Sequence, residues 1–181
     1  MTQTYKDSEI IFNNIITRTS VRSYLDKPVE DYKIEKLLRA GMTAPSALNI
    51  QPWHFVVVTN KATLEKIAEI TPNARMAKEA PLAIVVCGDM RNEGNDLVRE
   101  FWVQDASAAT QNILLAAHAL ELGAVWTGTY PAKNRCEAIS QLLNLPSSII
   151  PFATIVIGYP REIQQPKDKW KEENISYEVF G

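Results

Sequence analysis

The sequence predicts an α/β protein with three layers, in which helices flank a small central mixed sheet. Segments with the apolar spacing of a helix alternate along the chain with short apolar runs rich in β-branched residues, which is typical of this class. The chain has 181 residues, of which 46% are apolar, enough for one sizeable core but too little for two comfortable domains. We therefore expect a single domain over residues 1–181.

Five segments carry apolar residues three or four positions apart and are predicted to contain helices. In chain order they are residues 7–17, 28–41, 61–70, 94–122 and 133–143. Asp7 or Ser8 can cap the first helix, and Gly41 and Gly123 are expected to end the second and the fourth.

Four apolar runs between these helices are predicted to be strands. They cover residues 55–59, 82–87, 124–129 and 152–157. The first two are continuously apolar, so we expect both of their faces to be buried. Cys87 lies in the second strand and is expected to be an inert buried thiol.

The long helix within residues 94–122 is apolar on more than one face, so more than one face must be covered. It also carries small residues that let another backbone approach: Ala106, Ala108, Ala109, Ala116, Ala117 and Ala119. We expect a second copy of the chain to cover this helix in a homodimer; the alternative is a helix buried within its own subunit. Asp105 is expected on the helix surface or at that interface. Residues 161–181 are polar with scattered aromatic residues, and are expected to form a C-terminal extension that packs on the partner subunit.

Composition excludes several classes of function. A net charge of −2 leaves no basic surplus for nucleic acid or for a membrane surface. Residues 1–7 lack the apolar run of a signal peptide, and the weakly charged stretch 112–129 is interrupted by His118 and Glu121. Two widely separated cysteines fit a reducing, cytoplasmic compartment. The chain lacks a dinucleotide-binding glycine fingerprint, a Walker sequence, metal-ligand spacing and a hydrolase triad, so we expect no bound metal.

A phosphate site is predicted at residues 18–22, just past the end of the first helix. Arg18 and Arg22 offer guanidinium groups that can donate two hydrogen bonds each, and Thr19 and Ser20 add hydroxyl groups. The alternative is a solvated basic turn.

A second candidate is the loop between Pro45 and Pro52, which leads directly into the first strand. The two prolines restrict the backbone at both ends, and Ser46 and Asn49 supply short polar side chains. Such a loop suits the edge of a planar heterocycle. Residues 53 and 54, a tryptophan and a histidine, are expected to be structural rather than catalytic.

A third candidate is the segment 125–131, where Gly128 would let the backbone approach a ligand closely. The alternative is an ordinary turn after a strand.

Together, the 18–22 cluster and the proline-bracketed loop ahead of a strand resemble the flavin site of the FMN-dependent nitroreductase family. The resemblance runs from about residue 10 to about residue 169. It implies an α+β sandwich that dimerises, with FMN bound at the subunit interface by both chains. It also implies a ping-pong oxidoreductase that takes a hydride from NADH or NADPH and reduces a small-molecule acceptor, a nitroaromatic compound or a quinone.

The resemblance implies a set of cofactor-binding residues, and no catalytic side chain, because the flavin carries the chemistry. The residues implied for the phosphate are Arg18, Thr19, Ser20, Arg22, Lys167 and Lys169, with Gly158 near the phosphate or the ribityl chain. Those implied for the ring are Pro45, Ser46, Ala47, Asn49, Gln51, Asn73, Trp126, Thr127 and Gly128. The chain departs from the family pattern at Ala47, where a serine is common, and at Met76, where some relatives have a lysine.

Two other functions share this fold and remain open at this stage. One is a flavin-binding sensor or carrier without nicotinamide-driven turnover. The other is a dehalogenating or flavin-fragmenting enzyme. The chain is short for the family and lacks the helical insertion that forms a substrate lid in larger members, so the acceptor is the least transferable inference.

Overall fold

A four-stranded sheet forms the centre of the protein. The computed structural model describes residues 3–91 and 100–180. The strands are β1 (Trp53–Val58), β2 (Leu82–Asp89), β3 (Gly123–Gly128) and β4 (Ile149–Gly158). Their order across the sheet is β1-β2-β4-β3, so β1 and β3 are the two edges. The four predicted strands are therefore present, each within a few residues of its expected position.

The sheet differs from the prediction in strand direction. Every pair of neighbouring strands is antiparallel, whereas we expected a mixed sheet. Within the described residues, the one parallel pairing is an isolated bridge between Ser20 and Ala124. The sequence alternation of helix and strand suggested crossover connections. In the structure, the helix after β1 is followed by a second helical segment that packs along it, which returns the chain to the end of the sheet where β1 stops.

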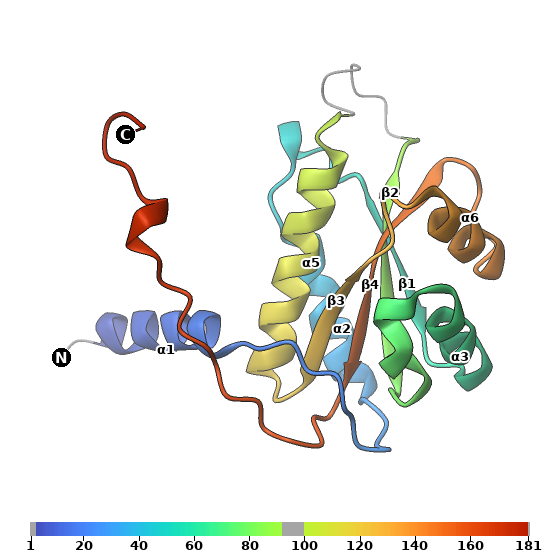
Figure 1. Cartoon of the computed structure of the whole chain (residues 1–181), viewed down its shortest axis with the longest axis horizontal. Helices are drawn as coiled ribbons and strands as arrows, with labels where there is room; N and C mark the ends of the chain where they lie inside the picture. The colour runs from blue at the N-terminus through green and yellow to red at the C-terminus, as the bar shows by residue number, and fades with distance from the viewer. Residues whose placement is uncertain (1–2, 92–99, 181) are drawn as a thin grey trace.

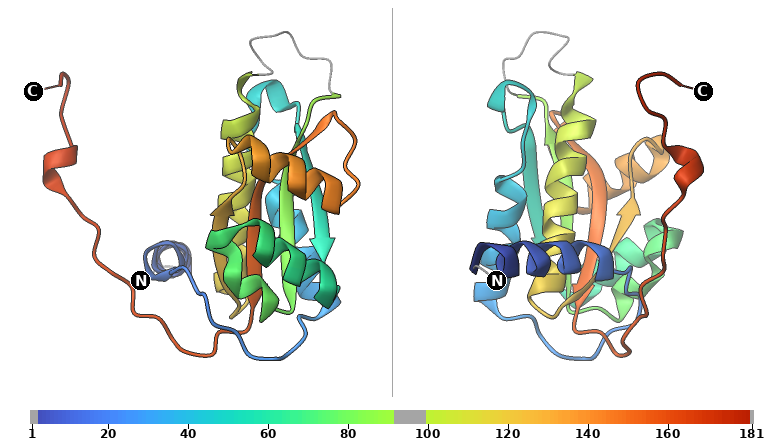
Figure 2. Two further views of the ribbon diagram at one scale, coloured as in Figure 1. Left: turned by 45° about the vertical axis from the view of Figure 1, so that its right-hand side comes forward. Right: turned by 90° about the vertical axis from the view of Figure 1, so that its left-hand side faces the viewer.

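Helices cover both faces of the sheet, which confirms the three-layer prediction (Figures 1 and 2). On one face lie α2 (Asp31–Met42) and α5 (Trp102–Ala119). On the other face lie α3 (Lys61–Ile70), the 3₁₀ segment η2 (Pro72–Lys78) and α6 (Lys133–Leu142). The predicted helix within 94–122 is described from Trp102 onward, and residues 94–99 lie outside the described residues.

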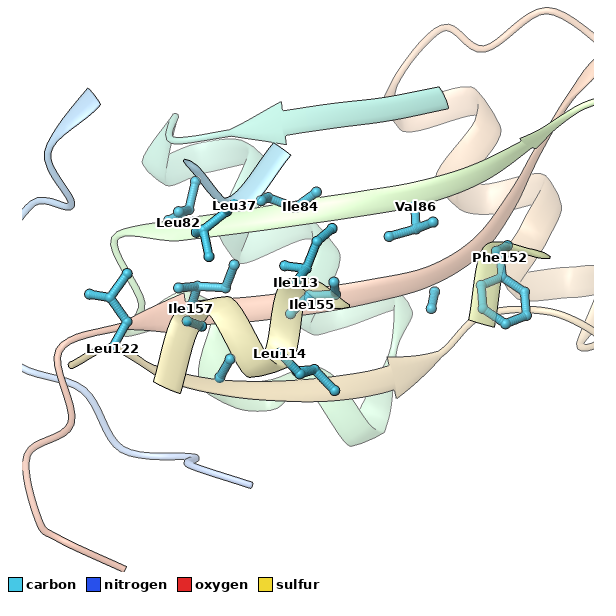
Figure 3. Packing of buried hydrophobic residues seen from close by; sticks show 14 of the residues in the cluster. Leu37, Leu82, Ile84, Val86, Ile113, Leu114, Leu122, Phe152, Ile155 and Ile157 are labelled. Atoms are coloured by element: carbon cyan, nitrogen blue, oxygen red, sulfur yellow. The ribbon is translucent and has the colours of Figure 1, made fainter. Parts of the chain in front are cut away.

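The side chains of β2 show how the sheet builds two cores at once. Successive residues of a strand point to opposite faces. Leu82, Ile84 and Val86 pack on the α5 side, as Figure 3 shows, where Ile113 of α5 faces them. Residues 83, 85 and 87 belong to the core on the α3 and α6 side. Because β2 lies inside the sheet and helices cover both faces of the sheet, both faces of β2 are buried as predicted, and so is the Cys87 thiol.

Strand β1 is less buried than we predicted. Val57 is 38% exposed, and only Val58 in this strand is fully buried. The reason is topological, because β1 pairs only with β2 and forms an edge of the sheet. An apolar, β-branched sequence cannot by itself distinguish a central strand from an edge strand.

Two glycines that we expected to end helices have other roles. Gly41 lies inside α2, where an added Cβ would lie 3.0 Å from Ile113 Cδ1, so this glycine lets α2 approach α5. Helix α5 ends at Ala119, and Glu121 rather than Gly123 takes the left-handed conformation after it (φ 61°). Gly123 lies in β3, packed against Val21.

A lysine side chain from α2 caps the end of α5. Lys33 Nζ donates a 3.0 Å hydrogen bond to Leu120 O, one of the carbonyls at this end that have no partner within the helix.

Helix α1 (Gln3–Thr17) lies across α5 outside the three layers (Figures 1 and 2). Its end at Thr17 is the predicted one. Two side-chain contacts connect it to α5: Asn14 Nδ2 donates to Leu115 O at 3.1 Å, and Thr17 Oγ1 lies 2.8 Å from His118 Nε2. Its large apolar side chains are 49–67% exposed, and these are Ile10, Ile11, Phe12, Ile15 and Ile16.

The C-terminal segment leaves the body after β4 and runs away past α1 (Figure 1). It contains the short 3₁₀ turn η3 (Glu172–Asn174). Several of its large side chains are mostly exposed, including Trp170 at 72% and Tyr177 at 84%.

Gly158 provides a test of how tightly the end of β4 packs against Pro81 and Tyr24. An added Cβ there would lie 2.7 Å from Pro81 Cδ and 3.0 Å from Tyr24 Cδ1, inside a buried contact. We expect Gly158→Ala to lower the free energy of unfolding by about 1–3 kcal/mol, because the core must shift to admit the methyl group.

Gly128→Ala is the matched control. An added Cβ at Gly128 meets only Tyr130 O at 3.9 Å, so this change should cost less than about 0.5 kcal/mol. Urea unfolding of both variants checks the prediction, and equal stabilities would contradict it.

Candidate active site

A groove of about 970 Å³ lies between the end of α1, the chain that follows it, α5 and the C-terminal segment. Its walls include all six residues that we expected at a phosphate: Arg18, Thr19, Ser20, Arg22, Lys167 and Lys169. We call this space the cation groove. The structure thus brings together two clusters that are far apart in the sequence.

Backbone pairing explains why these two clusters meet. After α1 ends, Val21 N donates to Ala124 O at 3.1 Å, which lays this segment along the outer edge of β3. The C-terminal segment starts beside it, since Arg161 N donates to Ser23 O at 3.0 Å and Arg161 Nη2 donates to Tyr24 O at 2.8 Å. Both segments therefore leave the sheet at the same corner.

The cation groove carries a surplus of positive charge. Its four basic side chains face one carboxylate, that of Asp168, whose Oδ1 accepts a hydrogen bond from Trp170 N at 2.9 Å. Within residues 3–91 and 100–180, none of the four takes part in an ion pair. Arg22 Nη1 donates only a long bond, 3.4 Å, to Ser20 O. Free guanidinium and ammonium donors converging on one groove are suited to a phosphate group.

A second hollow, of about 460 Å³, opens along the edge of β3. We call it the ring hollow. Its walls are formed by η2 and β3: Arg22, Pro72, Asn73, Arg75, Met76, Val125, Trp126, Thr127 and Gly128. Arg22 lines both spaces, so the ring hollow and the cation groove adjoin at this residue. The hydroxyl of Thr127 is buried and donates to Thr154 O at 2.8 Å.

Gly128 is exposed at one end of the ring hollow. The nearest atom to a Cβ built there is Tyr130 O at 3.9 Å, so the space beside its backbone is open. Within the described residues, β3 pairs with β4 and, at Ala124 alone, with the segment that holds Ser20 and Val21, so backbone hydrogen-bonding groups nearer Gly128 face outward. A planar ring can therefore approach this edge and meet backbone donors and acceptors.

Sequence reasoning missed Arg75, which lines the ring hollow. Its Nε donates to Pro72 O at 3.1 Å, and no acidic residue is among those that line the hollow. The hollow therefore carries two guanidinium groups, from Arg22 and Arg75. Its position two residues after the predicted ring residue Asn73 could have indicated Arg75, but only the fold of η2 shows that both residues line one space.

The proline-bracketed loop has a closed, irregular backbone. Within it, Ser46 Oγ accepts a hydrogen bond from Gln51 N at 2.9 Å, and Gln51 Nε2 donates to Asn49 Oδ1 at 3.1 Å. The 3₁₀ turn η1 (Ala47–Asn49) occupies its centre. Pro45, Asn49 and Gln51 are exposed, and Ser46 and Ala47 are half-buried.

This loop lies on the opposite edge of the sheet from the ring hollow. It leads into β1, whereas the hollow is on β3, and three strand spacings of about 4.8 Å separate them. It also lies near the other end of α5 from the cation groove, since Ala47 contacts Asp105 while Thr17 contacts His118. At 1.5 Å per helical residue, those two contacts are about 20 Å apart. None of the predicted ring residues of this loop lines the groove or the hollow of its own chain.

Gly158 and Asp105 lie elsewhere than we expected. Gly158 is buried at the end of β4 against Pro81 and Tyr24, away from both spaces. Asp105 is only 6% exposed and accepts a hydrogen bond from Ala47 N at 3.1 Å, so it is not on the helix surface of this subunit. Burial raises its pKa. The loop that covers it comes from a distant part of the sequence, which is why helical periodicity could not show this contact.

Comparisons with known proteins show which family the chain belongs to. A family model described as the nitroreductase family matches residues 15–74 and 71–159. The chain belongs to this family. A protein of Methanothermobacter thermautotrophicus, provisionally named an NADH dehydrogenase/NAD(P)H nitroreductase, is 48% identical over 94% of this chain and 87% of its own length.

Solved structures give the same result for the fold. A protein of Bacteroides thetaiotaomicron with the same provisional name has a TM-score of 0.89 and 45% identity, over 94% of this chain and 98% of that one. A protein of Desulfovibrio desulfuricans, provisionally named a nitroreductase and solved in complex with FMN, has a TM-score of 0.79 and 32% identity over 94% and 98% of the two chains. The "FMN reductase [NAD(P)H]" of Bacillus subtilis is 25% identical over 93% of this chain and 73% of its own.

Two further findings concern the described part of the chain. No helix in residues 3–91 and 100–180 has the length and apolar character needed to cross a bilayer. The same residues hold no cluster of histidine, cysteine, aspartate or glutamate that could bind a metal ion.

The contact between His118 and Thr17 predicts a pH dependence of stability. Burial, and secondarily the charge of Arg18, lower the pKa of His118 from its usual value of about 6.5. The unfolded chain therefore binds a proton more readily than the folded chain below about pH 6.5, so stability falls as the pH falls.

Replacing this residue by glutamine should remove that effect and keep a donor for Thr17 Oγ1. We expect wild type to lose more stability than His118→Gln between pH 7.5 and pH 5.5, as measured by urea unfolding. A variant that loses as much as wild type would show that this histidine does not control the acid sensitivity.

Proposed function

We propose that this protein is an FMN-dependent oxidoreductase that oxidises NADH or NADPH and reduces nitroaromatic or quinone-type acceptors by a ping-pong mechanism. The observation that carries the proposal is that the cation groove and the ring hollow adjoin at Arg22. A cluster of phosphate-binding groups next to a space along a strand edge suits a phosphorylated planar cofactor. The FMN reductase from Bacillus subtilis and the FMN-bound protein from Desulfovibrio desulfuricans support the choice of cofactor.

The donor set fits the phosphate of FMN. Arg18 and Arg22 can each bind two phosphate oxygens, whereas Lys167 and Lys169 contribute point charges without that fixed geometry. The hydroxyl groups of Thr19 and Ser20 would complete the set. Because these cations have no acidic partners of their own within the described residues, binding a phosphate breaks no existing ion pair.

The ring hollow fits the isoalloxazine group. Asn73 would reach a polar edge of the ring, the backbone from Trp126 to Gly128 would lie beside it, and Arg75 would place positive charge near it. When bound, FMN supplies the redox chemistry, taking a hydride from the nicotinamide and passing the electrons to the acceptor. No histidine, aspartate or glutamate lines the hollow, so the protein's part is to bind, orient and provide charge.

The polar loop would reach the ring from a second subunit. Pro45, Ser46, Ala47, Asn49 and Gln51 lie on the far edge of their own sheet, so a homodimer is required for both segments to meet one flavin. We propose this homodimer as the working form of the enzyme.

Two exposed surfaces support the dimer. Helix α1 exposes a row of large apolar side chains, and the C-terminal extension carries aromatic residues that are 72–100% exposed in the described structure. Gln111 of α5 lines the groove between these two surfaces, and Ala108 on the same side of α5 is only partly buried. We propose that the partner subunit covers these surfaces. The two free cysteines of this chain support a cytoplasmic location.

The visible spectrum of the purified protein tests the proposed function. We expect flavin absorption bands that bleach when NADH or NADPH is added without oxygen, and that return on addition of a quinone or a nitroaromatic compound. Bands that persist would indicate a flavin-binding protein without nicotinamide-driven turnover. Absence of bands, even after incubation with FMN, would contradict the proposal.

Arg18→Ala should weaken FMN binding by about 10- to 150-fold, because it removes a charged donor worth about 1.5–3 kcal/mol. Fluorescence titration of the flavin-free protein measures this. Arg39→Ala is the matched control, since Arg39 lies on α2 in an exposed ion pair with Glu35 and lines neither space. Equal affinities for the two variants would remove Arg18 from the phosphate site.

A further inference from the structure

The loop between Pro45 and Pro52 adopts a backbone that its sequence does not favour. Leu48, Asn49 and Gln51 have φ values of 50°, 57° and 56°. This left-handed region suits glycine, and none of the three is a glycine. Three such residues in a loop of this length must be held in place by contacts around them.

Contacts inside the loop close it on itself but do not fix where it stands on the protein. Asn49 N donates to Ser46 O at 3.0 Å, and Ser46 Oγ accepts from Gln51 N at 2.9 Å. At its C-terminal end, Pro52 O accepts a hydrogen bond from Asp89 N at 3.1 Å. At its N-terminal end the loop follows α2, where Ala44 is buried, and a further connection ties η1 to α5.

Asp105 supplies that connection. Its Oδ1 accepts the hydrogen bond from Ala47 N at 3.1 Å, at the start of η1 and beside Ser46. The side chain is more than nine-tenths buried, and α5, which carries it, is packed on the sheet. Burying a carboxyl group costs desolvation energy that an apolar residue in this position would avoid. The hydrogen bond from Ala47 N offsets part of that cost and gives the buried carboxyl group a role.

The second oxygen of this carboxyl group is also informative. Oδ2 is buried and has no hydrogen-bond partner in the described part of the chain. Asp105 therefore acts on the loop through Oδ1 alone, and a change at Oδ2 should leave that bond intact.

We propose that Asp105 is the positioning residue of the flavin loop: by holding Ala47 N, it sets where Ser46 and Asn49 meet the ring. This role rests on the proposed function. Asp105 is buried beneath the loop and bonds to its backbone, so it acts on the cofactor through Ala47.

Two variants separate this role from simple packing. Asp105→Asn keeps an oxygen acceptor for Ala47 N and replaces the unpartnered Oδ2 with the NH2 group of the side-chain amide. Asp105→Ala removes the acceptor. We expect Asp105→Ala to weaken the binding of FMN and of riboflavin by the same factor, about tenfold, and Asp105→Asn to stay within about threefold of wild type.

Riboflavin is the informative second ligand because it lacks the phosphate. Arg18→Ala should weaken FMN and leave riboflavin unchanged, whereas Asp105→Ala should weaken both. An Asp105→Ala variant that binds riboflavin as wild type does would overturn the proposal.

Hydrogen exchange at the Ala47 amide gives a readout that needs no flavin. In the flavin-free protein we expect this amide to be protected in wild type and in Asp105→Asn, and to exchange faster in Asp105→Ala. If wild type binds neither flavin, the proposed function fails, and this exchange rate still decides whether Asp105 holds the loop. If Asp105→Ala does not fold, Asp105→Asn decides: loss of Ala47 protection or of riboflavin affinity in that folded variant would contradict the role.

Discussion

Helix α5 is the constraint on which the rest of the structure depends. Ile113 and its neighbours anchor it to the sheet. Near its start, Asp105 holds the polar loop through Ala47, and near its end His118 meets Thr17, just before the cation cluster. Its length keeps these two groups about 20 Å apart. No repacking of one subunit can bring them together while this helix remains straight and buried.

This separation gives the two edges of the sheet different tasks. The β3 edge carries the cations and an open backbone, which in the proposed site bind and polarise an anionic, planar cofactor. The β1 edge carries a strained, polar loop whose position is set from inside the core. In the proposed dimer, a site assembled from both edges would exclude water more fully than either edge alone, and cofactor binding would depend on subunit association.

Local patterns in the sequence predicted the three layers, the end of α1 at Thr17 and the placement of the 18–22 cluster beyond it, because these depend on residues a few positions apart. The prediction that Lys167 and Lys169 lie beside the 18–22 cluster came from the family resemblance. The sequence could not show the antiparallel order of the strands, the edge position of β1 or the burial of Asp105, which arise from contacts between distant segments. Arg75 was missed for the same reason.

The central claim is that one flavin is held by the cation groove of one chain and the loop of the other. A heterodimer of differently tagged chains tests it, with Arg18→Ala in one chain and Ser46→Ala together with Asn49→Ala in the other. If the site is shared, one of the two sites pairs an intact groove with an intact loop, and the heterodimer binds one FMN with wild-type affinity. If each chain forms its own site, every site is damaged and no FMN binds with that affinity, which would contradict the account.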